Sequence, residues 1–374
     1  MVDPITFVRS EEQTMLASTV RELVEASATL DSVRDMSLTT DAFNRDVWQG
    51  LAEMGLIGLT VPEEYGGAGY GFAEMAVVFE ELGRMVTPVP LLSSLLAATA
   101  VLESGDHDQK AALLPGIASG ETVGSLAAFE APHCDGVTSI MTSATRSDNG
   151  WVISGTKRFV TDAPNVDLFV VTAIADGETG LFAVGSGVRG VTVTATPSLD
   201  PTRPLGQVTF DEVLVPAEAY LGGGASSDAV VRAVDVGVAA LAQEQVGGAQ
   251  RCLEMATEYA KTRYQFGRAI GSFQAIKHMC ANMLVDVEHS KSAAWHVART
   301  IDDPAESPIA VPLARSVCSD VYLAVAGANI QVHGGIGFTW EHDAHLYFKR
   351  AKSTSLLLGP VDRYRDRLAE AIGI

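Results

Sequence analysis

Hydrophobic residues in the second half of the chain recur at steps of three and four, a spacing that places them on one face of an α-helix. This pattern predicts three long helices, over residues 234–262, 273–302 and 309–329. Gly267 and Gly271 lie between the first two, so we expect a turn that joins two antiparallel helices. The third helix is very rich in Ala and Val and should be buried on most sides.

The first third of the chain is also predicted to be helical. Amphipathic or Ala-rich patterns indicate helices over residues 11–28, 42–55, 71–84, 91–102 and 109–118. In the first of these helices, Met15 and Val24 belong to the apolar face. Asp41 precedes the second helix and has a side chain typical of an N-cap.

The pattern changes near residue 121 to short β-rich runs that are separated by turn residues. Strands are predicted at residues 151–155, 168–173, 180–184, 190–196 and 207–215. Asp148, Asn149 and Gly150 form a hairpin signal directly before the first strand. We therefore expect an α+β protein with an N-terminal helical domain (residues 1–120), a middle β-barrel or β-sandwich domain (121–222) and a C-terminal helical bundle (223–374).

Composition narrows the class of protein. The chain has 374 residues, of which 47% are hydrophobic and 19% are charged, so it can bury a large core. Its 46 acidic residues outnumber its 26 Lys and Arg, and the formal net charge of -20 disfavours nucleic acid as a partner. The four cysteines are widely spaced, which is typical of reduced thiols and indicates neither disulfides nor a zinc site.

The sequence shows no signal for export or for a membrane. The N-terminus turns acidic without a basic segment followed by an apolar segment, so no secretory signal is evident. The apolar runs are interrupted before they reach membrane-spanning length, so we expect no membrane span. Together with the reduced thiols, these features predict a cytoplasmic protein.

The turn between the first two long helices carries candidate binding residues. Arg263, Phe266 and Arg268 lie close together, and Gln274 follows at the start of the next helix. Arginine and glutamine offer donors to phosphate, and phenylalanine offers an apolar plate to a ring, which suits a cofactor that contains both. An exposed basic turn with one anchored aromatic explains the same residues, and on their own they favour that simpler interpretation.

Four motifs stand in order along the chain. They are Val61-Pro-Glu-Glu-Tyr-Gly-Gly, Gly155-Thr-Lys-Arg-Phe-Val-Thr161, Arg263-x-x-Phe266-Gly with Gln274, and Gln331-Val-His-Gly-Gly-Ile-Gly-Phe338. Each motif alone is weakly specific, but together they resemble the acyl-CoA dehydrogenase family of flavoproteins. The resemblance extends over essentially the whole chain. It implies a C-terminal four-helix bundle, a bound FAD and a tetramer built as a dimer of dimers.

The resemblance also implies which residues hold the FAD. Phe159 and Thr161 match the strand that packs an aromatic ring against the isoalloxazine and offers it a hydroxyl. Phe159 replaces the usual tryptophan, which keeps the apolar plate and loses an N–H donor. Further residues match contacts to the pyrophosphate and adenosine of an FAD that is bound mainly by a neighbouring subunit: Arg263, Phe266, Gln274, Gln331, Gly334 and Gly335.

The reaction that the resemblance implies is the α,β-dehydrogenation of an acyl-CoA thioester. A carboxylate removes the α-proton while the β-carbon transfers hydride to flavin N5. Family members carry this base at one of two positions, which correspond here to Gly237 and Leu358. The flavin loop of the β domain also departs from the family pattern, over residues 129–136. The catalytic base is therefore unknown from the sequence.

Two acidic residues are possible substitutes for the base. Glu244 lies two helical turns, or about 11 Å, after Gly237, and Asp362 lies four residues after Leu358. We favour a structural or solvated role for both of them. The sequence Glu341-His342-Asp343-x-His345 resembles a metal site, but no third cluster completes it and a polar helix start explains it better, so we expect no metal.

Three functions stay open on this basis. The first is a complete FAD-dependent acyl-CoA dehydrogenase of lipid metabolism with an unidentified base. The second is a subunit without a base that completes the FAD site of a partner in a hetero-oligomeric, actinobacterial-type acyl-CoA dehydrogenase. The third is a flavin oxidase or monooxygenase with the same fold. For the first two we expect an acyl-CoA substrate, electron-transfer flavoprotein as electron acceptor, and a homo-oligomer or a hetero-oligomer with a paralogous subunit.

Overall fold

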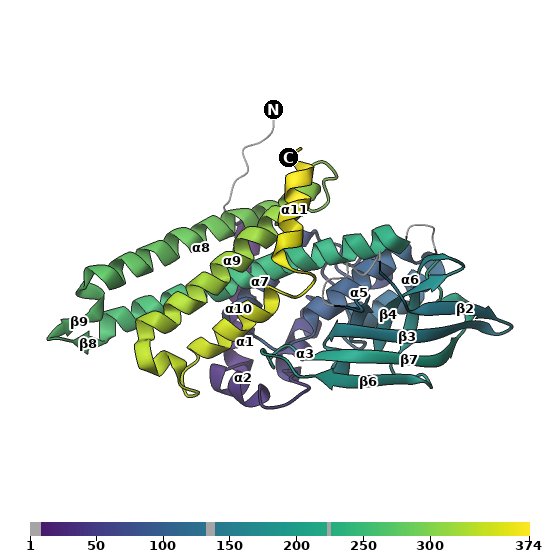
Figure 1. The fold of residues 1–374 in the computed structure, drawn as a ribbon, viewed down its shortest axis with the longest axis horizontal. Helices are drawn as coiled ribbons and strands as arrows, with labels where there is room; N and C mark the ends of the chain where they lie inside the picture. The colour runs from purple at the N-terminus through teal and green to yellow at the C-terminus, as the bar shows by residue number, and fades with distance from the viewer. Residues whose placement is uncertain (1–8, 132–138, 223–225) are drawn as a thin grey trace. The chain divides into compact units, whose positions relative to one another are not determined.

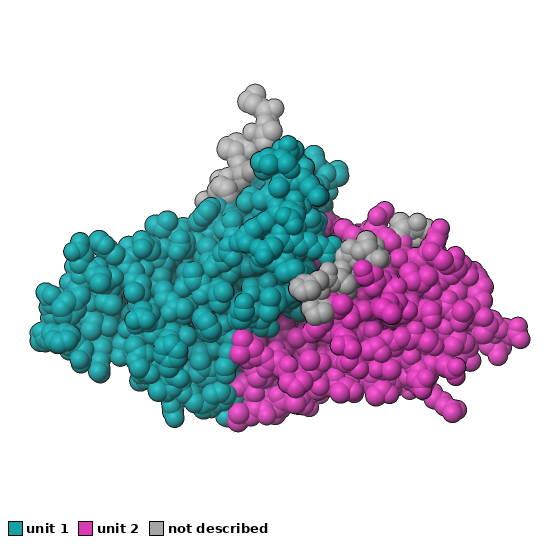
Figure 2. Space-filling view, in the orientation of Figure 1, with its two compact units in different colours: residues 1–35, 72–87, 238–374 teal, residues 36–71, 88–237 magenta. Residues whose placement is uncertain are grey.

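A computed structural model describes residues 9–131, 139–222 and 226–374 of the chain (Figure 1). The chain forms two compact units, and each is built from segments that are distant in sequence (Figure 2). Unit 1 comprises residues 1–35, 72–87 and 238–374, and unit 2 comprises residues 36–71 and 88–237. The division into three consecutive domains stays a prediction.

Unit 1 is helical. Its N-terminal segments hold α1 (Glu11–Ser27), α2 (Leu30–Met36) and α4 (Phe72–Arg84). Its C-terminal segment holds α7 (Ser226–Thr262), which begins in unit 2, and then α8 (Gln274–Thr300), α9 (Ser307–His333), α10 (Ala344–Thr354) and α11 (Val361–Ala371). A two-stranded hairpin of β8 (Tyr264–Gln265) and β9 (Arg268–Ala269) joins α7 to α8, so the predicted turn is confirmed.

The core of unit 1 is a bundle of α7, α8, α9 and α10, which confirms the predicted four-helix bundle. All four helices contribute to one apolar cluster: Ala249, Cys252, Leu253, Ala256, Ala260, Met283, Val287, Tyr322, Val325, Ala326, Val332, Tyr347 and Ala351. We expected no apolar run of membrane-spanning length, but residues 307–338 pass that test by length and composition alone. Since 56% of the most apolar window is buried inside the structure, its position as a core helix of the bundle explains its composition.

Unit 2 is built on a seven-stranded sheet. Its strands are β1 (Gly124–Ala127), β2 (Ser143–Ser147), β3 (Gly150–Thr161), β4 (Leu168–Ala175), β5 (Glu178–Gly185), β6 (Val191–Thr196) and β7 (Leu205–Val215). The order is β1-β4-β2-β3-β7-β6, with β5 paired to β4. β4 runs parallel to β1 and β2, whereas the other pairs are antiparallel. The helices of this unit are α3 (Arg45–Glu53), α5 (Leu91–Ser104), which packs on β1, and α6 (His107–Ala118), which packs on α5.

Local sequence signals set the ends of several elements. The predicted hairpin is confirmed, because β2 and β3 pair with Ser147 opposite Gly150 across a two-residue turn. The predicted N-cap at Asp41 is wrong, because α3 begins later and the Asn44 side chain accepts a hydrogen bond from the Val47 N–H at 3.0 Å. The short helix α2 was not predicted from the sequence.

The buried face of α1 also differs from the prediction. Val24 is buried as expected, but Met15 is exposed, and Gln13 lies in the contact instead. The Gln13 side-chain N–H donates to Glu74 on α4 at 3.1 Å. Because α1 packs on α4 partly through polar and charged groups, apolar periodicity alone places its inner face incorrectly.

The helices α4 and α7 cross at two glycines. A Cβ atom on Gly247 would lie 1.9 Å from the Glu80 carbonyl oxygen, and one on Gly83 would lie 2.1 Å from the Glu244 carbonyl oxygen. These distances are shorter than any real contact, so the two backbones meet where only glycine leaves room. This crossing fixes the part of α7 that carries Glu244.

Gly247→Ala is expected to destabilise the protein by about 3 kcal/mol or more, because the added methyl group must push two helix backbones apart. Thermal unfolding of the purified chain measures this loss. The matched control is Gly327→Ala on α9, where a Cβ would meet only the Phe348 ring at 3.9 Å. That change should be neutral or stabilising by up to about 1 kcal/mol, because alanine favours the helix. Equal melting temperatures for the two variants would contradict the close crossing.

Candidate functional site

The tip between α7 and α8 displays an exposed aromatic ring. Phe266 and Gly267 have φ values of 52° and 78°, so both central residues of the hairpin turn are left-handed. The Phe266 ring is 92% exposed. The Arg268 guanidinium lies 4.1 Å from the centre of the Phe273 ring, and Arg263 and Gln274 are exposed at the ends of the two helices. The structure therefore brings three predicted cofactor residues, Arg263, Phe266 and Gln274, to one tip, with their side chains toward the outside of unit 1.

The end of α9 lies beside the end of α7. The rings of Tyr259 and His333 stack with their centres 4.4 Å apart. Gln331, Gly334 and Gly335 are exposed in this segment. A Cβ atom on either glycine would meet nothing within 4 Å. Gly334 caps α9 with a φ of 63° and a ψ of -140°, a conformation that favours glycine, whereas the packing of this chain does not explain Gly335. A partner or ligand that approaches the backbone closely would explain it.

In unit 2, β3 carries the other two predicted cofactor residues. The register of β3 with β7 shifts between Lys157 and Val160, and Phe159 in this bulge has a φ of 55°. A left-handed aromatic residue in a bulge is strained, and such residues often serve to direct a side chain. Thr161 is buried, and its carbonyl accepts a hydrogen bond from the Ser125 hydroxyl at 2.8 Å.

A buried ion pair anchors the start of the loop over residues 129–136, which departs from the family pattern. The Lys157 ammonium is fully buried and donates to Glu130 at 2.5 Å and to the Thr172 hydroxyl at 2.8 Å. The Glu130 carboxylate also accepts from the backbone N–H groups of Met141 and Thr142. Glu130 thereby joins both ends of the loop to β3, although residues 132–138 of the loop lie outside the described residues.

Glu130→Gln is expected to destabilise unit 2 by about 3 kcal/mol, because it leaves the Lys157 charge buried without its partner. Burial alone would raise the pKa of Glu130, but hydrogen bonds from Lys157 and Thr142 lower it below the ordinary value of 4.5. The stability from this group is therefore present at neutral pH and is lost as pH falls below that value. Unfolding measured from pH 7 to pH 3 should show the loss in the wild type and a flatter profile in the variant.

The control for this experiment is Asp176→Asn, which removes an exposed carboxylate from its pair with Arg146. An exposed pair of this kind contributes about 0–1 kcal/mol. A similar loss of stability in both variants would show that the buried pair has no special role.

The two positions that the resemblance assigns to the base, Gly237 and Leu358, carry no carboxylate. Gly237 lies on α7, and Leu358 is buried in the loop between α10 and α11 with a φ of 61°. The Leu358 carbonyl accepts from the Tyr364 hydroxyl at 2.6 Å, and the fully buried Arg315 guanidinium donates to the carbonyls of Leu357 and Gly359 at 2.6 and 2.9 Å. The loop backbone is thus held by hydrogen bonds to three consecutive carbonyl groups, those of residues 357–359.

The two possible substitutes for the base are both engaged elsewhere. The Glu244 carboxylate is buried and accepts a hydrogen bond from the buried Arg350 guanidinium at 2.9 Å. Such a pair holds a carboxylate in its charged form and directs it toward α10. The Asp362 side chain is 87% exposed and pairs with Arg365 at 2.6 Å. A general base for an α-proton needs a desolvated carboxylate that faces the substrate, and neither residue fits this description.

Glu244→Gln is expected to cost about 3–5 kcal/mol of stability, because the buried Arg350 guanidinium then loses its ion pair with Glu244. A Glu244 that served as base would behave differently, since its loss would abolish flavin reduction and leave stability nearly unchanged. Thermal unfolding and flavin reduction of the same samples distinguish the two roles. Asp362→Asn, at an exposed site, is the control and should change stability by less than about 1 kcal/mol.

The histidine-rich segment before α10 has structural contacts. Asp343 forms an ion pair with Arg34, and the His345 ring stacks on Trp340 with centres 4.8 Å apart. The backbone N–H of Ala344, the first residue of α10, donates to His342 Nδ1 at 3.1 Å. The polar residues therefore stand at a helix start, as the sequence predicts. Over residues 9–131, 139–222 and 226–374, no group of three metal-ligating side chains is found.

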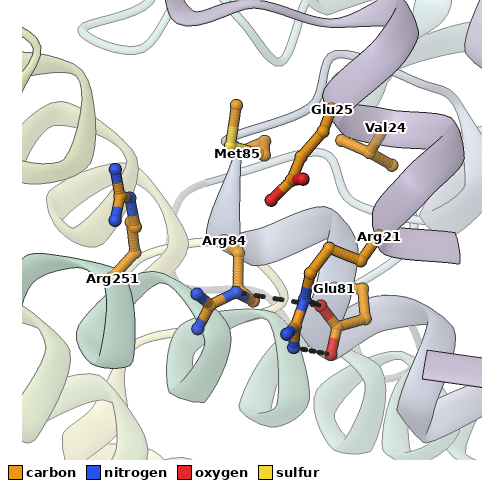
Figure 3. Close-up of a pocket in the computed structure, with 7 residues that line it drawn as sticks. All are labelled: Arg21, Val24, Glu25, Glu81, Arg84, Met85 and Arg251. Atoms are coloured by element: carbon orange, nitrogen blue, oxygen red, sulfur yellow. Dashed lines mark hydrogen bonds and ion pairs between the residues drawn. The ribbon is translucent and has the colours of Figure 1, made fainter. Parts of the chain in front are cut away.

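Unit 1 contains a cavity of about 170 Å³, and Figure 3 shows the side chains that line it. Side chains from α1, from α7 and from the C-terminal end of α4 line it: Arg21, Val24, Glu25, Glu81, Arg84, Met85 and Arg251. Arg21 donates twice to the buried Glu81, at 2.9 Å each, and Arg84 donates twice to Glu254, at 3.0 and 2.7 Å. The carboxylates neutralise the arginines, so the cavity is part of an ion-pair network that holds α1 and α7 to α4.

Comparison with known proteins places this chain in a family. The families described as "Acyl-CoA dehydrogenase, N-terminal domain", "middle domain" and "C-terminal domain" match residues 10–121, 127–213 and 228–373. The chain is 34% identical to "Acyl-CoA dehydrogenase IpdE2" of Mycolicibacterium smegmatis over 362 residues, which cover 96% of this chain and 98% of that protein.

Solved structures agree with these matches. The ChsE4-ChsE5 complex from Mycobacterium tuberculosis has a chain with a TM-score of 0.89 and 29% identity, covering 98% of this chain and 99% of that one. The Tcur3481-Tcur3483 steroid ACAD variant has a chain with a TM-score of 0.87 and 32% identity, covering 97% of this chain and 98% of that one. The fold is therefore that of an FAD-dependent acyl-CoA dehydrogenase, as predicted.

The chain belongs to the acyl-CoA dehydrogenase family. Its cofactor is FAD, and its reaction is the dehydrogenation of an acyl-CoA thioester. FAD supplies the hydride acceptor in this reaction.

Proposed function

We propose that this chain is the subunit without a catalytic base in a hetero-oligomeric acyl-CoA dehydrogenase. The observation that carries the proposal is the use of Glu244. It lies on α7 two turns after Gly237, and it is buried in an ion pair with Arg350. Gly237 and Leu358 offer no carboxylate, and Asp362 is exposed and paired. A paralogous subunit would then supply the base.

The contribution of this chain to the assembly is the set of FAD contacts at the end of its bundle. Arg263, Phe266 and Gln274 lie at the tip, and Gln331, Gly334 and Gly335 lie at the end of α9. Their exposure and the open space beside the glycine pair support contact with a dinucleotide outside this chain. Phe159 and Thr161 of β3 would face the isoalloxazine ring of an FAD whose site only the complex of the two chains completes.

Similar proteins support a hetero-oligomer rather than a homo-oligomer. Two of the similar structures are complexes named for two different proteins, ChsE4-ChsE5 and Tcur3481-Tcur3483. We infer a tetramer built as a dimer of dimers, with electron-transfer flavoprotein as electron acceptor and a role in lipid metabolism. The described cysteines Cys252, Cys280 and Cys318 are free thiols, which suits the cytoplasm.

The test is the flavin content of the chain purified alone and after co-expression with a paralogous acyl-CoA dehydrogenase subunit. The proposal expects a stable complex of the two chains that holds FAD, and little FAD on this chain alone. A chain that purifies alone as a homo-oligomer with one FAD per polypeptide would overturn the proposal and favour the complete dehydrogenase.

Arg263→Ala should weaken FAD retention in the complex by about tenfold or more, because a charge-assisted contact to phosphate contributes roughly 1.5–3 kcal/mol. Release of FAD on dilution, followed by its fluorescence, measures the effect. Lys352→Ala removes one exposed positive charge from α10 and is the control for a change in net charge alone. Equal FAD release from both variants would remove Arg263 from the set of cofactor contacts.

A further inference from the structure

The segment that carries Gly334 and Gly335 is closed by a contact between two histidines. His333 ends α9, and His342 lies two residues before α10. Their ring centres are 4.3 Å apart, and the His333 ring also stacks on Tyr259 of α7. Because the two imidazoles stand at the two ends of the segment, their contact holds it in a fixed loop on the end of the bundle.

The protonation state of His342 is defined by its hydrogen bond. Its Nδ1 accepts from the backbone N–H of Ala344 at 3.1 Å, so this nitrogen carries no proton. Ala344 is the first residue of α10, and its N–H is one of the helix-end donors that need an acceptor outside the helix. A proton on Nδ1 would remove that acceptor and place a positive charge at the positive end of the α10 dipole.

The groups around His342 also disfavour its protonation in the closed loop. His333 Nδ1 donates to the Asn329 carbonyl at 2.8 Å and leaves only its Nε2 to take up a proton. The other charged or titratable neighbours of His342 are Asp343, His345 and Arg34. Asp343 favours a cation but is paired with Arg34, whereas His345 and Arg34 disfavour one. Two imidazolium rings in contact would repel each other.

Burial, and after it the proximity of His333, lowers the pKa of His342 below the ordinary value of 6.5. Burial likewise lowers the pKa of His333, partly offset by its hydrogen bond to Asn329. An unfolded or opened loop therefore binds protons more readily than the closed loop. The closed loop is fully stable above about pH 6.5 and loses stability as pH falls below it.

We propose that His342 is a positioning residue for the FAD contacts at Gln331, Gly334 and Gly335, and that its protonation releases them. His342 acts by closing the loop through His333 and Ala344. The inference rests on the proposed function in one respect, namely that this loop contacts FAD in the assembled enzyme. It adds a proton-binding site that makes cofactor retention depend on pH.

The experiment uses the FAD-loaded complex and follows FAD release at about pH 7.5 and about pH 5.5, on either side of the ordinary histidine value. For the wild type we expect release to be about five- to tenfold faster at the lower pH, the size of effect of one helix-end hydrogen bond. His342→Asn keeps an acceptor for the N–H two residues on and cannot titrate, so it should release FAD slowly at both pH values. His342→Ala lacks the acceptor and should release FAD fast at both.

His289→Asn, on the exposed face of α8, is the control and should keep the wild-type dependence on pH. The inference fails if His342→Asn keeps that dependence too, or if His342→Ala retains FAD as well as the wild type at about pH 7.5. A merely structural histidine would not move the pH profile in the asparagine variant. Arg263→Ala separates this outcome from failure of the proposed function, because unchanged FAD release there would reject the cofactor contacts themselves.

Discussion

The ion pair between Glu244 and Arg350 is the interaction on which the rest of the structure depends. It ties α7 to α10 inside the bundle, one turn from the glycine crossing that fixes α7 against α4. Both groups are buried, so each charge needs the other. The same pair gives Glu244, two turns after Gly237, a structural role. On the proposed function, the stability of the bundle and the loss of Glu244 as a base have one physical origin.

The loop after α10 is also held by a buried charge, that of Arg315. Arg315 is fully buried, and all its hydrogen bonds go to backbone carbonyls, those of Thr354, Leu357 and Gly359. Carbonyl dipoles at the end of α10 thereby stabilise its charge. Leu358 lies between the last two of these carbonyls in a left-handed conformation. The hydrogen bonds to these carbonyls therefore hold Leu358 in place at the position that the resemblance assigns to a base.

Much of the fold follows from hydrophobic periodicity, because long helices and strands with one buried face repeat regularly. The N-cap of α3 and the inner face of α1 were predicted wrongly, since Asn44 and Gln13 act through hydrogen bonds that no periodicity reveals. The partner of Glu244 could not be predicted either. Arg350 lies 106 residues further along the chain, and nothing in either local sequence marks the pair.

Part of the candidate site could likewise be predicted from the sequence, and part could not. The motifs around Arg263 and Gln331 were visible as short patterns, because turns at helix ends need glycine and because phosphate contacts need arginine. The bulge that places Phe159 and the closure of the α9–α10 loop by His333 and His342 were not visible. They depend on register shifts and ring contacts that exist only once the elements are packed.

The most direct test of the central claim is the visible spectrum of the flavin after anaerobic addition of acyl-CoA. The measurement compares this chain alone, supplied with FAD, and its complex with a paralogous subunit that carries a glutamate at the usual base position. The account predicts that the flavin bleaches only in the complex, and that replacing the partner's glutamate with glutamine abolishes the bleaching. Bleaching of the flavin with this chain alone would contradict the account, because the chain would then contain a working base of its own.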